Sequence, residues 1–416
     1  MSDLVNEGHQ RALEILHACA GPHGFVASPV DTANYRRVWG RDGSIMTLAA
    51  LASGDDELIR VGRITLRTLA QHQGPHGEIP SNVDPRAERV SYGGTAGRVD
   101  AGLWWTLAVV AAWKHAADGD AFLEEMERPL ERYRHLLGAW EYNARGLLYV
   151  PPTGDWADEY VQSGYVLYDQ LLYRAALRGL AEVRRARRDP ADHALDEHAA
   201  RLTHLITANY WFEEGAEEPP ADVYHRVLWS KGLDAAEHCH GTHWMPFFSP
   251  QGYGTRFDAM AHALISLFGV SSDARDETVD AHLDAHVAVE LTDGAWVLPA
   301  FHPVITPKDA YWDELQMSFS YEFKNQPQHY HNGGLWPLVT GLYAAAKAAR
   351  GDHERAERFR RGVHAANHVE VDGQAWSFPE YLDGAEHRAG GTSPLGWSAA
   401  AAVIADAYVD GVRLFD

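Results

Sequence analysis

The lengths of the gaps between helical segments constrain the fold of this chain more than any other feature. Apolar residues recur at i, i+3 and i+4 spacing in twelve segments, and this period predicts helices. The segments cover residues 4–19, 42–53, 56–72, 98–117, 120–140, 164–187, 191–209, 255–269, 273–289, 332–350, 352–368 and 393–409. Between them, five connections of about one to five residues alternate with six of about 20–45 residues.

The five short connections share their chemistry. They are Ser53-Gly54-Asp55, Asp118-Gly119-Asp120, Asp189-Pro190, Ser271-Ser272-Asp273 and Gly351-Asp352. A glycine that ends one helix and an Asp or Ser that caps the next are typical of tight αα-hairpins. Helices that alternate in direction put every short turn at one end and every long loop at the other. The sequence therefore predicts an all-α fold, an (α/α)6 barrel, with an active site in the long loops at one mouth.

The chain has 416 residues and no Pro/Ser-rich linker or low-complexity run, so we expect a single catalytic domain over 1–416. No basic and apolar leader opens the chain, and no apolar run has the length of a membrane span. Two cysteines, Cys19 and Cys239, make no disulfide framework. These features predict a cytoplasmic protein without a membrane partner; a homo-oligomer stays open.

The formal charge of −22 argues against a nucleic-acid partner, because phosphate backbones are bound by basic surfaces. A strongly acidic surface is found in salt-adapted proteins, although an Arg- and Ala-rich composition explains it equally well.

Many of the large aromatic residues fall in the long loops, among them Trp39, Tyr92, Trp156 and Trp336. Flat aromatic faces suit the C–H faces of sugar rings. The alternative is that these side chains pack a large barrel. The interpretation that we favour is a small oligosaccharide or disaccharide as the substrate.

The third long loop, Thr153 to Tyr160, places Asp155, Asp158 and Glu159 around Trp156. Like charges at this spacing raise the pKa of at least one carboxyl, and an adjacent indole removes water from it. A carboxyl with a raised pKa can act as a general acid near neutral pH. The alternative is an acidic turn in solvent.

A second carboxyl suited to catalysis is Glu380, in the sixth long loop, about 220 residues beyond Asp158. Both loops belong to the same predicted mouth. Hydrolysis of a glycosidic bond needs two such groups, because one protonates the leaving oxygen while the other deprotonates water.

Other loops supply polar groups. Arg41-Asp42 and Asp100 stand at predicted helix starts, where they are either readers of sugar hydroxyls or helix-start carboxylates. The fifth loop ends in the distinctive string His329 to Pro337, with donors, aromatics and two glycines.

The fourth loop contains His238, Cys239, His240 and His243. Their spacing fits no closed zinc site. We therefore expect no metal and no cofactor. The sequence leaves undecided whether this loop folds over the pocket as a lid.

Taken in order, these strings resemble the neutral/alkaline invertase family of glycoside hydrolases (family 100) and, more distantly, the glucosidase domain of glycogen-debranching enzymes. The matching strings are Arg41-Asp42, Gly97-Arg98-Val99-Asp100-Ala101, Leu103-Trp104-Trp105, Trp156-Ala157-Asp158, Gln170, Ala175-Ala176-Leu177, Asn209-Tyr210-Trp211, Arg256-Phe257-Asp258, Lys324-Asn325, Tyr330 to Pro337 and Pro379-Glu380-Tyr381. The resemblance spans about residues 35–400. It implies an (α/α)6 barrel with two catalytic carboxyls, Asp158 as the proton donor and Glu380 as the general base.

The resemblance also implies a sugar subsite formed by Arg41, Asp42, Asp100, His331, Asn332 and Trp336. To these we add further candidate binding residues: Trp39, Tyr92, Arg98, Asp155, Trp156 and Gln170. Two departures from the invertase pattern, Trp156 to Tyr160 and Glu78 to Asn82, lean toward debranching enzymes.

The sequence therefore predicts an inverting, exo-acting hydrolase of a small α-glycoside, with sucrose as the leading substrate. An α-1,6-glucosidase is the alternative within the class. A sugar epimerase or isomerase, and a carbohydrate-binding protein without catalysis, are the alternatives outside it.

Overall fold

The computed structural model describes residues 2–115, 118–189, 192–213, 215–237, 239, 241–292, 294–319 and 321–415. Each of the twelve predicted segments contains a helix in this part of the chain. The helices are α1 Ser2–Cys19, α2 Gly40–Ser53, α3 Asp56–Gln71, α4 Asp100–Lys114, α5 Gly119–Trp140, α6 Leu167–Ala186, α7 Asp192–Tyr210, α8 Arg226–Ala236, α9 Ala259–Leu267, α10 Asp273–His282, α11 Trp312–Met317, α12 Pro337–Ala349, α13 His353–Asn367 and α14 Gly396–Val409. Two short helices, α8 and α11, lie inside long loops and were not predicted.

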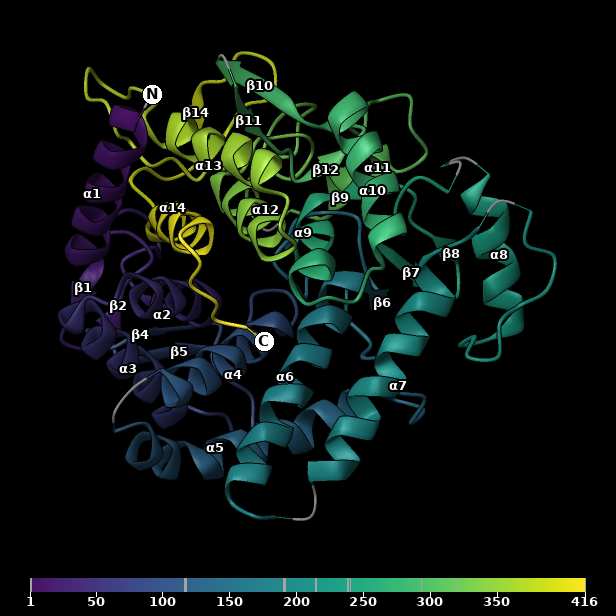
Figure 1. The fold of residues 1–416 in the computed structure, drawn as a ribbon, viewed down its shortest axis with the longest axis horizontal. Coiled ribbons are helices and arrows are strands. Elements are labelled where there is room, and N and C mark those ends of the chain that lie inside the picture. The colour runs from purple at the N-terminus through teal and green to yellow at the C-terminus, as the bar shows by residue number, and fades with distance from the viewer. Residues whose placement is uncertain are drawn as a thin grey trace.

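Six helices form a closed inner ring. Helix α2 packs against α4, α4 against α6, α6 against α9, α9 against α12, α12 against α14, and α14 again against α2. Figure 1 shows this ring, with the chain running round it from purple to yellow. A second layer lies outside: α3, α5, α7 and α13 pack against α2, α4, α6 and α12, and α1 packs against α14. The predicted (α/α)6 barrel is confirmed.

Composition separates the two layers. Inner helices such as α4, α12 and α14 are buried on almost all sides, whereas outer helices such as α3 and α13 bury one face. A helix that is apolar all round is a buried one, and an amphipathic helix covers a core. Small residues bring the inner helices close together: a Cβ at Gly341 on α12 would stand 2.5 Å from the carbonyl oxygen of Ala401 on α14.

The short turns use the predicted capping chemistry at several positions. Gly54 ends α2 in the left-handed conformation, and Asp55 then accepts hydrogen bonds from the first turn of α3. Ser272 and Asp352 cap α10 and α13 in the same way. The turn at Gly119 differs from the prediction, because this glycine is the first residue of α5 and Asp118 makes no side-chain cap. Pro190 lies outside the described residues.

Within the described ranges, fourteen short strands occupy the connections. They are β1 Ala20–Gly21, β2 Gly24–Phe25, β3 Val38–Trp39, β4 Asn82–Asp84, β5 Arg89–Ser91, β6 Tyr165–Val166, β7 Phe247–Ser249, β8 Gly252–Tyr253, β9 Phe257–Asp258, β10 Val289–Thr292, β11 Ala295–Val297, β12 Phe301–His302, β13 Tyr381–Leu382 and β14 Ala389–Gly390. They pair into small antiparallel sheets in the orders β1-β2, β3-β4-β5, β6-β7-β8, β9-β12, β10-β11 and β13-β14.

Several inner helices begin later than predicted because a strand precedes them. Residues 165–166 and 257–258 are extended and paired as β6 and β9, so α6 begins at Leu167 and α9 at Ala259. Backbone pairing with a neighbouring loop therefore overrides the helical period just before α6 and α9. Strand β3 also leads into α2, but α2 begins at Gly40, two residues earlier than predicted.

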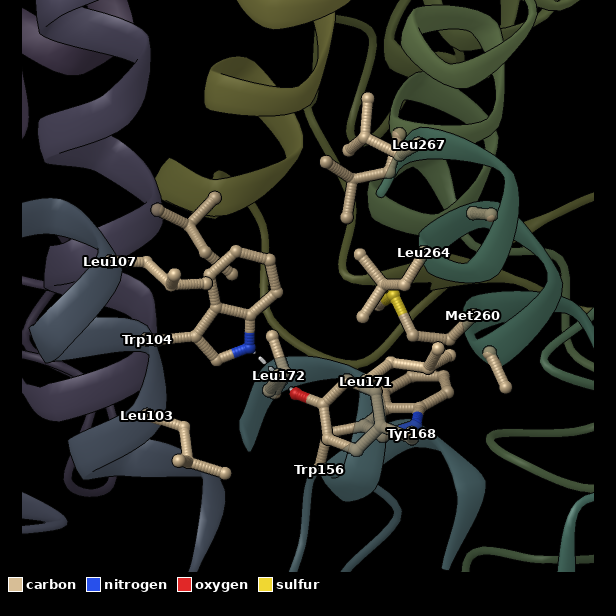
Figure 2. Close-up of a cluster of buried hydrophobic side chains, with 14 of the residues drawn as sticks. Leu103, Trp104, Leu107, Trp156, Tyr168, Leu171, Leu172, Met260, Leu264 and Leu267 are labelled. Carbon is tan, nitrogen blue, oxygen red and sulfur yellow. Dashed lines mark hydrogen bonds between the residues drawn. The ribbon is translucent and has the colours of Figure 1, made fainter. Parts of the chain in front are cut away.

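The interior of the ring is filled by large side chains from α4, α6 and α9 (Figure 2). The indole N–H of Trp104 donates to the hydroxyl of Tyr168 over 2.7 Å, and that hydroxyl donates to Asp100 over 3.0 Å. Asp100 is fully buried in the first turn of α4. This chain of hydrogen bonds joins the hydrophobic core to the base of the site.

No helix in the described ranges is long and apolar enough to cross a membrane. Both cysteines are buried and free.

Candidate active site

A pocket of about 580 Å³ opens among the long loops at the start of the inner helices. Seven predicted site residues line it: Trp39, Arg41, Asp42, Arg98, Trp156, Asp158 and Glu380. The two predicted catalytic carboxyls, from loops far apart in the chain, therefore share one cavity. Four of the inner helices, α2, α4, α6 and α9, carry an Asp in the first turn or at the N-cap, where the helix dipole favours negative charge.

Asp158 lies on the loop between α5 and α6, and about a quarter of its side chain is exposed. The guanidinium of Arg98 donates to its Oδ2 over 2.6 Å. Arg98 lies two residues before the start of α4 and also lines the pocket. The contact fixes one carboxylate oxygen, which leaves the other for a ligand.

Glu380 is buried and held from two sides. The hydroxyl of Tyr35 lies 3.0 and 3.1 Å from its two carboxylate oxygens, and the backbone N–H of Thr392 donates to Oε2 over 3.0 Å. Burial raises the pKa of Glu380 to about 7, although the N–H of Thr392, the charge of Lys324 and the hydroxyl of Tyr35 all oppose this rise. A carboxyl with a pKa near 7 is suited to accept a proton at neutral pH.

Arg41 and Asp42 stand in the first turn of α2. The guanidinium of Arg41 donates to Asp100 over 2.9 Å and lies 3.9 Å from Asp42. Burial raises the pKa of Asp42 to about 6, against the charge of Arg41. Asp42 reaches the pocket, but Asp100 lies behind Arg41 and supports it rather than lining the cavity.

Asp155 also lies behind the pocket. Its carboxylate accepts hydrogen bonds from the backbone N–H of Ala157 and from the amide of Gln162. Burial, together with the nearby charge of Asp100, raises the pKa of Asp155. The sequence predicted a raised pKa for at least one carboxyl among Asp155, Asp158 and Glu159. The raised pKa is that of Asp155, which supports the loop of Asp158.

Two predicted binding amides bond to backbone instead of facing the cavity. The side chain of Gln170 donates to the carbonyl of Leu148 and accepts from its N–H, each over 2.9 Å. Asn332 makes the same paired contact with Ile305, at 2.8 and 2.6 Å. Both amides are buried; Gln170 fastens a loop to α6, and Asn332 joins two parts of the connection that precedes α12.

Three predicted aromatic groups also lie away from the lining. The rings of His331 and Trp336 are buried and stacked, with centroids 5.1 Å apart, and neither ring nitrogen of His331 has a hydrogen-bond partner in the described part of the chain. Both rings contact Trp156, which does line the pocket. Tyr92 donates its hydroxyl to the carbonyl of His72.

The pocket includes residues that we did not select from the sequence. They are Ala33, Asn34, Tyr35, Arg37, Ser81, Asn82, Ser91, Gly93, Gly94, Glu159, Tyr321, Lys324, Tyr330 and Trp397. Lys324 lies over the ring of Tyr330, at 4.9 Å, and 3.8 Å from Glu159. Both Lys324 and Tyr330 belong to the strings that carry the family resemblance, which was the available signal for them.

The histidine-rich fourth loop does not line this pocket in the part that is described. His238 and His240 lie outside the described residues. His243 is buried between Thr242 and the carbonyl of Thr255, and the thiol of Cys239 donates to the same carbonyl. Among the described residues, no three His, Cys, Asp or Glu side chains are placed to hold a metal ion.

Comparison with known sequences agrees with the resemblance noted from the motifs. The chain is 24% identical over 423 aligned positions to a probable chloroplastic alkaline/neutral invertase A of Arabidopsis thaliana, an alignment that covers 89% of this chain and 64% of that protein. The chain thus spans less than two thirds of this relative. No protein-family model matches the chain.

Comparison with solved structures confirms the fold. A bacterial glucoamylase complexed with acarbose superposes with a TM-score of 0.67 and 16% identity, covering 98% of this chain and 56% of its own. A family 63 mannosylglycerate hydrolase of Thermus thermophilus superposes with a TM-score of 0.62 and 15% identity, covering 95% and 99%. The names of these two proteins and of the plant relative are those of glycoside hydrolases.

Proposed function

We propose that this protein is an inverting, exo-acting glycoside hydrolase of a small α-glycoside, with Asp158 as general acid and Glu380 as general base. The observation that carries the proposal is that these two carboxyls, from loops 222 residues apart (380 minus 158), line one pocket of about 580 Å³. The volume lies within the range of sites for small ligands. The sequence and fold likeness to glycoside hydrolases supports the same class.

Inversion is a single displacement, in which Asp158 gives its proton to the glycosidic oxygen as the bond to the leaving sugar breaks. The carboxylate that remains faces the guanidinium of Arg98, which stabilises its negative charge. The partial exposure of Asp158 is consistent with a position beside the entrance, where a leaving group departs.

In the same step, Glu380 removes a proton from water as the water attacks the anomeric carbon from the opposite face. Tyr35 and the N–H of Thr392 orient the carboxylate. Because water attacks opposite the leaving group, an α-glycoside yields a β-sugar. Arg41, Asp42 and Trp39 supply donors, acceptors and a flat face for the sugar in between.

Sucrose is the leading substrate, because the sequence relative is named an invertase. A second candidate, an α-1,6-glucosidase, is favoured by Glu159. This carboxyl follows Asp158 and lines the pocket where the invertase pattern has basic residues. The two candidates differ in the leaving group and share the catalytic pair.

A proton NMR time course with sucrose and isomaltose in one tube tests the proposal. Loss of sucrose supports an invertase, and loss of isomaltose supports the glucosidase; either reaction must show β-glucose before mutarotation. Appearance of α-glucose first contradicts inversion. Conversion of a free sugar with no loss of either disaccharide contradicts hydrolysis and supports an epimerase.

A further inference from the structure

A cleft of about 660 Å³ lies apart from the catalytic pocket and shares none of its lining residues. Four histidines line it, from three parts of the chain: His243, the pair His282 and His286, and His302. Their rings interact: the centroids of His243 and His282, and those of His282 and His286, are both 5.1 Å apart. Such a concentration of imidazoles on one cleft has no role in the proposed hydrolysis.

The four rings differ in whether their nitrogens take part in hydrogen bonds. Both nitrogens of His243 are engaged, one with the hydroxyl of Thr242 and the other with the carbonyl of Thr255. His282 and His286 make ring contacts but no hydrogen bond within the described residues. Their nitrogens therefore keep lone pairs that a ligand in the cleft can use.

The local backbone brings these two rings together. His282 is the last residue of α10, and the π-helical turn η1, Leu283–Val287, continues the same helix through His286. Two histidines four residues apart on one helix face can chelate one metal ion, as in the H-E-x-x-H arrangement. Single π-helical turns within helices are frequent at functional sites.

We propose that His282 and His286 form a chelating site for a divalent transition-metal ion of the Cu²⁺, Ni²⁺ and Zn²⁺ class. Imidazole nitrogen is a ligand that these ions prefer, whereas Mg²⁺ and Ca²⁺ prefer oxygen. Because no three described side chains are placed around one ion, the site has two protein ligands and water in the other positions.

The lining of the cleft carries little positive charge that would repel a metal ion. The one arginine in the described lining, Arg256, is paired with Asp309 over 2.7 Å, so its charge is offset.

Calorimetric titration of the whole protein with Ni²⁺ at pH 7.5 tests the site. His286→Gln, at an exposed position, should weaken Ni²⁺ binding by about tenfold or more, because it removes one of two imidazole ligands. His193→Gln is the matched control, because His193 is exposed on α7 beside Asp192, and it should bind as the wild type does. His282→Gln should weaken Ni²⁺ binding as much as His286→Gln does.

If His282→Gln does not fold, a thermal-shift measurement on the other variant still tests the site. Ni²⁺ should raise the Tm of the wild type and should not raise the Tm of His286→Gln. Cu²⁺ should bind more tightly than Ni²⁺, and Ni²⁺ more tightly than Co²⁺. Wild-type affinity in His286→Gln, or binding of Mg²⁺ as tight as that of Ni²⁺, would overturn the proposal. His286→Gln should keep its glycoside hydrolysis, so this result stands apart from the proposed function.

Discussion

The hydroxyl of Tyr35 lies 3.0 Å from one oxygen of Glu380 and 3.1 Å from the other, although the two residues are 345 positions apart. Tyr35 lies in the loop between α1 and α2, and Glu380 lies in the loop before α14. The contact thus joins the first and last long loops where the ring closes. It also favours the charged form of the proposed base, against the effect of burial.

The pH dependence of activity should follow Glu380. A general base must be ionised, and the pKa of Glu380 is about 7, so kcat/KM should fall about tenfold per unit as the pH drops below that value. Tyr35→Phe removes a hydrogen bond that favours the charged form, so it should raise the pKa and move the fall in activity to higher pH. A pH–rate profile of both proteins checks this. An unchanged profile in Tyr35→Phe would show that the hydroxyl does not act on the base.

A methyl group at Gly391 should displace the base. A Cβ there would stand 2.3 Å from Oε2 of Glu380, and Gly391 has a positive φ of 70°. Gly391→Ala should therefore lower kcat. The matched control is Gly373→Ala, since Gly373 has a φ of 78° and no atom within 4 Å of its Cβ position. Both variants should lose about 1 kcal/mol of stability from the left-handed backbone. Equal kcat in the two would contradict close packing at Glu380.

Gln170 should behave as a structural residue. Gln170→Leu leaves the N–H and the carbonyl of Leu148 without their partner and should cost about 1–3 kcal/mol for each group left unpaired. Denaturant unfolding measures this loss, and the KM of the variant that remains folded should match the wild type. A raised KM with unchanged stability would instead place Gln170 in contact with the sugar.

Asp406 should anchor α1 and α13 to α14. It accepts hydrogen bonds from His9, His364 and Arg360, at 2.8 to 3.0 Å. Burial opposes its ionisation, but these partners outweigh burial and hold its pKa well below the ordinary value. Asp406→Asn removes a buried carboxylate that accepts three hydrogen bonds and should cost about 3–5 kcal/mol.

The sign of the pH effect at Asp406 follows from the lowered pKa. Its stabilisation is complete above the unfolded pKa, about 4, and is lost as pH falls through the folded value. Urea unfolding at pH 7 and acid unfolding check both effects. Glu354→Gln is the control, because Glu354 is exposed and paired with Arg358 on the surface of α13, where a pair is worth about 0.5 kcal/mol. A similar small loss in Asp406→Asn would contradict the anchoring role.

The sequence predicted those structural elements that depend on residues close together in the chain. Helical period and capping residues such as Asp55 and Ser272 indicated the helix pairs, and the order of long and short gaps indicated the ring. The loops that carry Asp158 and Glu380 followed from that order. Both carboxyls indeed line one pocket.

Features that depend on backbone pairing could not be predicted in this way. An amide such as Gln170 or Asn332 can bond a sugar or a loop backbone, and the pattern of residues is the same in both cases. The place of Tyr35 at Glu380 depends on where two distant loops meet. The free histidines of the cleft, His282 and His286, lie outside the loop that the sequence marked as histidine-rich.

The central claim is the division of roles between Asp158 and Glu380. The most direct test compares Asp158→Asn and Glu380→Gln on two substrates: the disaccharide that the wild type hydrolyses, and an α-glycosyl fluoride, whose leaving group needs no proton. Both variants should fold and lose about 10²–10⁴-fold in kcat on the disaccharide. Asp158→Asn should keep most of its activity on the fluoride, and Glu380→Gln should lose it. The opposite pattern, or near-wild-type hydrolysis of the disaccharide by either variant, would contradict the account.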